Sequence, residues 1–216
     1  MKSLHIKWVI NCSIGELIGI GLAGSIAVAV NHWLGEPQSF LQKSFVLIIM
    51  LFAGALEGTS IAWFQWQVLH HLFPRMKFIS WWRWTVLIAL LGWAAGTTPS
   101  LFLSGSEPSS GSEPGFFLIA IVAVVGGGIA GALFGLFQSF VLKKHTGKWP
   151  WWIIANTIAW SVAMLIIFAG ATWPSAVTPV PVIVLSAIIS GCLAGLSLGV
   201  VTGLFLFHKI VNTKEV

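Results

Sequence analysis

The chain has 216 residues, of which 57% are hydrophobic and 8% are charged, and its net charge is +5. Ordinary soluble domains carry about 25% charged residues, so this composition excludes a soluble globular protein. The basic residues lie mostly in short segments between long apolar runs, which favours contact with anionic lipid head groups and disfavours binding to nucleic acid.

The apolar runs predict the fold class. A transmembrane helix needs about 20 predominantly apolar residues. Six runs meet this requirement, in chain order at residues 8–30, 45–69, 82–103, 116–142, 151–172 and 181–207. We therefore predict an all-α fold: a polytopic membrane bundle of six transmembrane helices, forming a single transmembrane domain over residues 1–216.

The charges between the runs predict the orientation. Ten of the eleven Lys and Arg residues fall in the N-terminal segment, the second loop, the fourth loop or the C-terminal segment, and the exception is Lys43. Basic segments stay on the cytoplasmic side of a membrane. Both termini are therefore expected to be cytoplasmic, in a multi-pass protein of the cell membrane.

A sequence motif recurs along the chain. The second run contains Gly54-Ala-Leu-Glu-Gly58 followed by Gln65, and the fourth contains Gly131-Ala-Leu-Phe-Gly135 followed by Gln138. The sixth run carries a weaker copy in an ambiguous register. The recurrence predicts three related helical hairpins, with Gly54–Gly58 matched to Gly131–Gly135. Spaced glycines of this kind let helix backbones approach closely in a membrane.

Some of these motifs resemble those of a group of uncharacterised small bacterial multi-pass membrane proteins that repeat a Gln-Trp-x-Val-Leu-basic element. The resemblance rests on the glycine motif at residues 54–58, on Phe64-Gln-Trp-Gln-Val-Leu69 with its basic loop, and on Gly92-Trp-Ala-Ala-Gly-Thr-Thr-Pro-Ser100. It covers about residues 50–175. It implies a multi-pass protein of the bacterial inner membrane and implies no particular activity.

Two acidic residues lie inside the apolar runs. The chain contains six acidic residues and no Asp, and Glu16 and Glu57 are the two that fall within predicted spans. A carboxylate there costs about 2.5–3.5 kcal/mol on insertion scales, so it needs a partner, a wet cavity or a proton. Both are expected to point into the bundle, to meet across an antiparallel pair formed by the first two helices, and to share a proton near neutral pH.

A second polar layer is expected nearer the cytoplasmic side. With the two acids, its amides make up the predicted ligand-binding or proton-binding residues. For these amides, interhelical hydrogen bonding is the competing interpretation. The amide residues are Asn11, Gln65, Gln67, Gln138 and Asn156.

Most of the 13 Trp residues lie near the ends of the runs. Such positions are typical of an aromatic belt at the membrane interface. The belt is predicted to include Trp8, Trp33, Trp81, Trp82, Trp149, Trp151, Trp152 and Trp173. The tryptophans predicted to lie deeper, between helices or along a cavity, are Trp63, Trp66, Trp93 and Trp160.

The sequence contains no recognisable catalytic motif, no metal-ligand spacing among its His and Cys residues and no indication of a cofactor, so an enzyme is disfavoured. We predict a small carrier or ligand-binding subunit that accommodates a solute or lipophilic ligand in the bundle core. The alternative is a non-enzymatic accessory, assembly or immunity-type protein that binds another membrane protein through its Gly/Ala-rich faces and basic loops. A variant of the first hypothesis is suggested by a similarity in size to the substrate-binding subunits of energy-coupling-factor importers. The small-residue step Ala23–Ala27 lies towards the outer end, however, away from the side on which such subunits couple.

Overall fold

The computed structural model describes residues 2–103, 115–173 and 178–211, and all regular structure within these ranges is helical. The elements are α1 (Lys2–Leu34), α2 (Phe40–Leu72), α3 (Phe78–Phe102), α4 (Phe116–Leu142), α5 (Pro150–Thr172), α6 (Val180–Phe205) and the short π-helix η1 (Leu206–Ile210) that continues α6. These six α-helices are long and apolar enough to cross a membrane. The prediction of an all-α protein with six candidate spans is confirmed.

Several helices extend beyond the apolar runs from which we predicted them. α1 and α2 have 33 residues each, about 50 Å at a rise of about 1.5 Å per residue. The hydrocarbon core of a bilayer is about 30 Å thick. A capping box fixes the start of α2. The backbone N–H of Gln42 donates to Ser39 Oγ, and the backbone N–H of Ser39 donates to Gln42 Oε1. Hydropathy locates the span, whereas polar capping sets where the helix begins.

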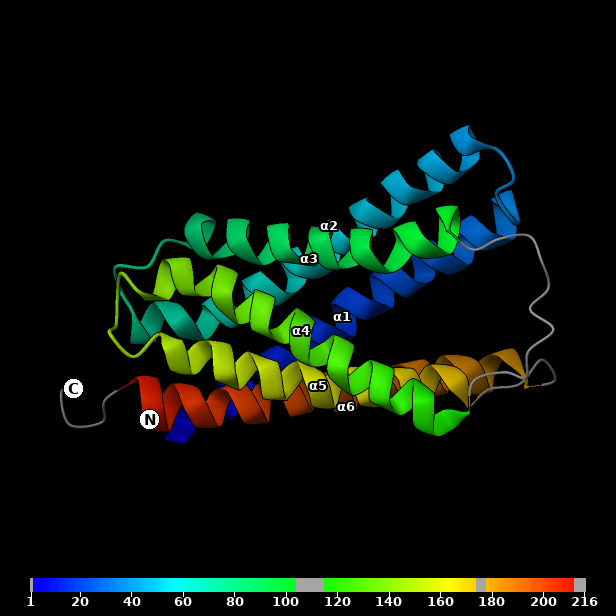
Figure 1. The fold of residues 1–216 in the computed structure, drawn as a ribbon. Helices are drawn as coiled ribbons and strands as arrows, with labels where there is room; N and C mark the ends of the chain where they lie inside the picture. The colour runs from blue at the N-terminus through cyan, green and yellow to red at the C-terminus, as the bar shows by residue number, and fades with distance from the viewer. Residues whose placement is uncertain (1, 104–114, 174–177, 212–216) are drawn as a thin grey trace.

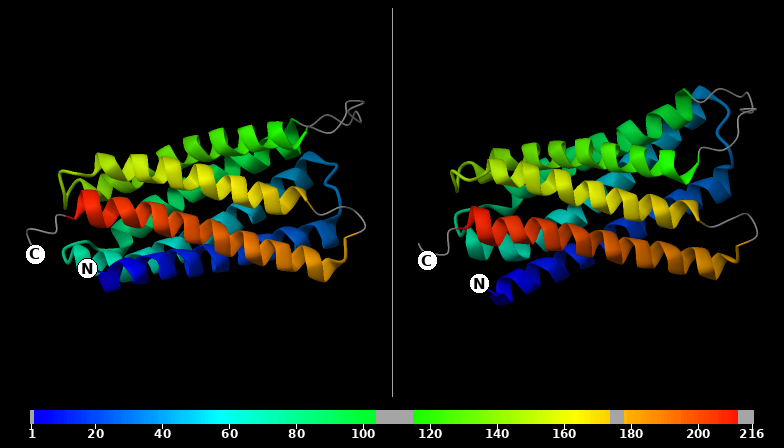
Figure 2. Two further views of the ribbon diagram at one scale, coloured as in Figure 1. Left: turned by 90° about the horizontal axis from the view of Figure 1, so that it is seen from below. Right: turned by 60° about the horizontal axis from the view of Figure 1, so that its bottom comes forward.

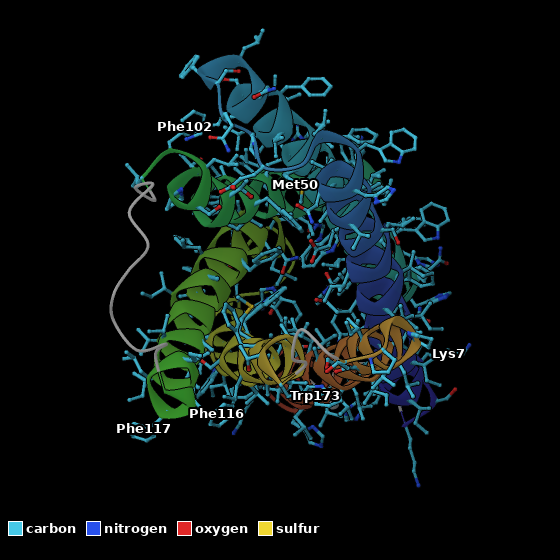
Figure 3. All side chains as sticks on the ribbon, turned by 90° about the vertical axis from the view of Figure 1, so that its right-hand side faces the viewer. Lys7, Met50, Phe102, Phe116, Phe117 and Trp173 are labelled. Atoms are coloured by element: carbon cyan, nitrogen blue, oxygen red, sulfur yellow. The ribbon has the colours of Figure 1, made fainter. Side chains whose placement is uncertain are left out.

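The helices alternate in direction (Figures 1 and 2) and form a ring, which is seen end-on in Figure 3. Each helix packs on the next in the chain, least extensively between α3 and α4, and α1 closes the ring against α6. One end of the bundle, which we call the basic end, contains the start of α1, the end of η1 and the loops 73–77 and 143–149. The exposed Lys and Arg of these segments give it this name. α3 and α5 end, and α2, α4 and α6 begin, at the opposite end.

Glycines bring neighbouring helices close together. The predicted pairs Gly54–Gly58 and Gly131–Gly135 face α3 and α5 respectively. A Cβ at Gly58 would stand only 2.8 Å from the Cβ of Ala89. The prediction that both glycine pairs face a neighbouring helix is confirmed.

The bundle is tightly packed at the basic end and loosely packed at the opposite end. The largest fully buried side chains include Trp8 and Leu69, near the basic end. At the opposite end, residues 181–185 of α6 are all exposed. This segment is longer than one helical turn, so every face of it is accessible. Figure 3 looks onto this end and shows Phe102, where α3 ends, well apart from Phe116, where α4 begins.

Candidate functional site

A layer of hydrogen-bonded side chains crosses the bundle on the basic side of its centre. Gln138 Nε2 donates to Thr85 Oγ1 at 3.0 Å and to Gln65 Oε1 at 3.3 Å. Gln65 Oε1 also accepts from Trp81 Nε1 at 3.2 Å, and Gln138 Oε1 accepts from Trp152 Nε1 at 2.9 Å. The layer therefore joins α2, α3, α4 and α5, and both glutamines serve as interhelical hydrogen-bonding residues.

Three tryptophans that we predicted to lie in the interfacial belt are core residues. Trp8, Trp81 and Trp152 have no exposed surface. Trp8 donates its indole N–H to Thr202 Oγ1 at 3.0 Å, and the other two donate to the glutamines. The belt prediction is wrong for these three because their N–H groups find acceptors inside the protein and need no interfacial water. Trp33, which is 84% exposed, has the exposure expected of a belt residue.

Glu57 is buried on α2 and receives one hydrogen bond from α3. Trp93 Nε1 donates to Glu57 Oε2 at 2.5 Å. The indole can reach this position because a Cβ at Gly54 would lie 2.5 Å from Trp93 Cδ1. Gly54 thus leaves the space on α2 in which Trp93 packs and meets the carboxyl group.

Glu16 is buried on α1 and lacks such a donor. It is 1% exposed, and within the described residues its Oε1 atom has no hydrogen-bond partner. α6 covers it closely, since a Cβ at Gly195 would lie 2.9 Å from Glu16 Cβ. A buried carboxylate without donors is strongly disfavoured relative to the neutral acid.

The two carboxyl side chains are neighbours across the interface of α1 and α2. A Cβ at Gly19, one turn along α1 from Glu16, would lie 2.9 Å from Glu57 Cγ, and the two acids interact electrostatically. Their contact is not a hydrogen bond through Glu16 Oε1, because that atom is unpartnered. The two carboxyl groups therefore lie close together, but Glu16 Oε1 makes no hydrogen bond to Glu57.

A small cavity of about 20 Å³ lies at the bundle centre beside Glu16. A cavity needs about 10–15 Å³ to hold a water molecule. This one has room for a single water and is too small for an organic solute. It is lined by the polar residues Cys12, Glu16, Gln65, Asn156 and Thr202 and by the apolar residues Ile61, Phe134, Trp160 and Leu198.

Three of the predicted site residues meet at this cavity, namely Glu16, Gln65 and Asn156. Glu57 and Gln138 are buried but do not line the cavity. Glu57 contacts α1 at Gly19, and Gln138 donates a hydrogen bond to the lining residue Gln65. The other two predicted residues are not part of the lining. Asn11 donates to the carbonyl oxygen of Phe64 at 3.1 Å, and Gln67 is half-buried.

Sequence reasoning missed Cys12 and Thr202 as cavity residues, because each is a single small side chain in an apolar run. A usable signal existed for Thr202. It follows Gly195 by seven residues, just as Gln65 follows Gly58. The expectation that Trp63 packs between helices or lines a cavity is wrong, since 48% of its surface is exposed.

Comparisons of the chain with protein-family models, with curated proteins and with solved structures find no match.

Proposed function

We propose that this protein is a small integral membrane carrier or ligand-binding subunit, with Glu16 and Glu57 as the charged or protonatable element of its core site. The observation that carries the proposal is the buried Oε1 atom of Glu16, which lies beside a partly polar cavity and has no hydrogen-bond partner among the described residues. Acids inside membrane spans are costly to keep and typically mark ion, proton or substrate pathways.

Packing alone gives no reason for an acid at residue 16. Glu16 lies eight residues after the buried Trp8 and faces Gly195. On α3 and α5, the residues eight positions after the other two buried tryptophans are Ala89 and Trp160, which face glycines in the same way. Alanine and tryptophan therefore satisfy the packing requirement at this kind of position, which favours a chemical role for the carboxyl group of Glu16.

The same contacts support three related helix pairs: α2 with α3, α4 with α5, and α6 with α1. In each pair a buried tryptophan on the odd-numbered helix donates to a Gln or Thr on the even-numbered one. The contacts favour an alignment of the three pairs in which Gly58 matches Gly131 and Gly195. This alignment is shifted by one helical turn from the predicted one, which matched Gly54–Gly58 to Gly131–Gly135. In this register the glycine precedes the polar residue by seven positions in every pair.

The uneven packing supports access to the site from one side. The basic end is sealed by the buried tryptophans, whereas the helices are loosely packed at the opposite end. Alternating access requires a central site that opens to one side at a time. We place the basic end at the cytoplasmic face of the cell membrane, where exposed Lys and Arg meet anionic lipid head groups. This conformation then opens towards the outside.

A second candidate function is binding to another membrane protein. Gly92 and Gly96 are exposed on the outer half of α3, and a Cβ at either would meet nothing within 4 Å. Small residues one turn apart on an open helix face suit close packing of another helix. An accessory protein of this kind would need no ligand in its core.

Ligand-dependent thermal unfolding separates the two functions. The purified protein in detergent is heated with lipophilic amines, neutral lipophiles or small polar solutes at several pH values. A carrier is stabilised by at least one class, by about 2.7 kcal/mol at a ligand concentration 100 times Kd. Glu16→Gln should abolish this stabilisation, and Glu36→Gln, at an exposed turn residue, should keep it. If no class stabilises the wild type, and Gly92→Leu releases a co-purifying membrane protein, the accessory function is correct.

A further inference from the structure

Glu16 and Glu57 differ in the hydrogen-bond donors available to them. Glu57 Oε2 accepts the indole N–H of Trp93, whereas Glu16 Oε1 accepts nothing within the described residues. A donated hydrogen bond favours a carboxylate, and burial without donors favours the neutral acid. Two neighbouring carboxyl groups in a low dielectric do not readily ionise together. A single proton on this pair is therefore best placed on Glu16.

The groups around the pair offer no compensating positive charge. On its own helix Glu16 has Cys12 beside it, and from α2 it faces Glu57. The cavity residues from α4, α5 and α6 are not titratable. Glu57 itself faces Gly19 on α1 and Trp93 on α3. Among the described residues that face the pair there is no Lys, Arg or His, so the proton is the cation that neutralises one of the acids.

The cavity supplies a place for a proton acceptor next to Glu16. Its volume of about 20 Å³ is sufficient for one water molecule, which needs two to four polar partners. Glu16, Asn156 and Thr202 line it. Asn156 is oriented by the hydrogen bond that its Nδ2 donates to the carbonyl oxygen of Trp152 at 2.8 Å.

We propose that the species exchanged at this central site is the proton, held on Glu16 and passed to one water molecule in the cavity, while Trp93 fixes Glu57 as the ionised partner. The step breaks the O–H bond of the Glu16 carboxyl group and forms one on the water oxygen. The water then gives up a proton towards the opposite end, and the doubly ionised pair persists only until a proton returns by the same route. This inference rests on the proposed carrier function and narrows it. The proton becomes the coupling ion, and any larger solute binds in the loosely packed half of the bundle.

The packing also fixes the side with which this proton exchanges. Towards the basic end the cavity borders the Gln65–Gln138 layer, which is buried and hydrogen-bonded, and beyond it lie the buried Trp81 and Trp152. Towards the opposite end lie Glu57 and a buried apolar cluster that includes Phe134, Trp160, Ala163 and Ala194, followed by the loosely packed half. Exchange in this conformation therefore takes place with the opposite end.

Infrared spectroscopy tests the assignment directly, because a protonated carboxyl group has a C=O stretching band separate from that of a carboxylate. The wild-type protein in lipid should show one such band near neutral pH, and the band should shift on exchange into D₂O. Glu16→Gln should abolish it, whereas Glu57→Gln should keep it. A band that survives Glu16→Gln and disappears in Glu57→Gln would place the proton on the wrong acid and overturn the proposal. A wild type without a band would overturn it as well, whether or not the variants fold.

The role of the water is tested by the rate at which the band shifts in D₂O. Asn156→Leu fills the cavity with an apolar side chain and should slow the shift at least tenfold. Asn11→Leu is the matched control, because it removes a half-buried amide outside the cavity, and the rate should stay unchanged. An unchanged rate in Asn156→Leu would contradict the water-mediated step.

These results are independent of the ligand experiment above. If the band behaves as expected but no ligand class stabilises the protein, the proton site stands and the carrier function fails. If a ligand stabilises the wild type and no carboxyl band exists, the carrier function stands and the proton assignment is wrong.

Discussion

Trp93 donates its indole N–H to Oε2 of Glu57 at 2.5 Å, across the interface of α2 and α3. The contact connects the single acidic residue of α2 to a residue 36 positions later in the chain. It gives the Glu57 carboxyl group a hydrogen-bond donor, whereas the Glu16 Oε1 atom has none in the part of the chain that the structure describes. The contact depends on the absence of a side chain at Gly54.

Replacing Trp93 with Phe should destabilise the protein. Trp93→Phe keeps an aromatic ring but leaves the Glu57 carboxyl group without its donor, which should lower the free energy of unfolding by about 1–3 kcal/mol. Trp33→Phe, at an 84% exposed tryptophan, is the control and should change it little. Thermal or denaturant unfolding in detergent measures both. In a Glu57→Gln background, which keeps an acceptor oxygen but no charge, the cost of Trp93→Phe should shrink, and an equal cost in both backgrounds would show that the ionised carboxylate adds nothing to the hydrogen bond.

Substitution by alanine should lower the stability of the protein at a glycine packed against another helix and should not lower it at a glycine facing open space. A Cβ at Gly131 would collide with the backbone carbonyl oxygen of Asn156, whereas a Cβ at Gly126 would meet none of the described residues within 4 Å. Gly131→Ala should destabilise the bundle by about 1–3 kcal/mol through overpacking. Gly126→Ala should be neutral or slightly stabilising, because alanine favours a helix over glycine by about 1 kcal/mol. Comparable unfolding midpoints for the two variants would rule out close packing of α4 on α5.

Buried tryptophans should contribute more to the stability of the protein than exposed neighbouring tryptophans. Trp152→Phe leaves Gln138 Oε1 without the donor that the structure gives it, a loss of about 1–3 kcal/mol for a buried acceptor. Trp151→Phe, one residue earlier and 40% exposed, should cost clearly less. The pair is compared by thermal unfolding in the same detergent. An interfacial role for Trp152 would instead make the two substitutions equivalent.

Cysteine labelling should establish the orientation. Glu36 and Gly147 are exposed at opposite ends of the bundle, and each is changed to Cys after Cys12 and Cys192 have been replaced by Ala. A membrane-impermeant maleimide should label Glu36→Cys in intact cells and Gly147→Cys only after permeabilisation, because the basic end is expected to be cytoplasmic. The reverse pattern would place the basic end outside.

The fold class could be predicted from hydropathy because each span must satisfy its backbone hydrogen bonds internally in lipid, which leaves a helix for an apolar run of this length. The sequence did not allow us to predict equally well which polar and tryptophan side chains lie in the core. Trp8 and Trp33 both lie near an end of α1, yet Trp8 is fully buried and Trp33 is not. Position along a helix does not indicate which face meets a neighbour, and the apolar helices of a membrane bundle show little hydrophobic periodicity from which to infer it.

Because the sequence does not show which helix faces are in contact, only part of the candidate site could be predicted. Glu16 and Glu57 could be singled out because a charge inside a span is costly wherever it faces. The donor Trp93 and the cavity residue Thr202 depend on which helices adjoin which, and α1 lies beside α6 through contacts between residues such as Trp8 and Thr202 that are 194 positions apart. No local pattern in the sequence encodes that closure.

The closure of α1 against α6 has a consequence for biosynthesis. Glu16 of α1 is covered by Gly195 of α6, so its enclosure depends on a helix that the ribosome makes only after the four intervening helices α2 to α5. Until then this acid can be accommodated only by the insertion machinery, by water or by a proton of its own. The core of the protein is therefore completed in a single late event, and a chain interrupted before α6 exposes an unpaired acid that membrane quality control can recognise.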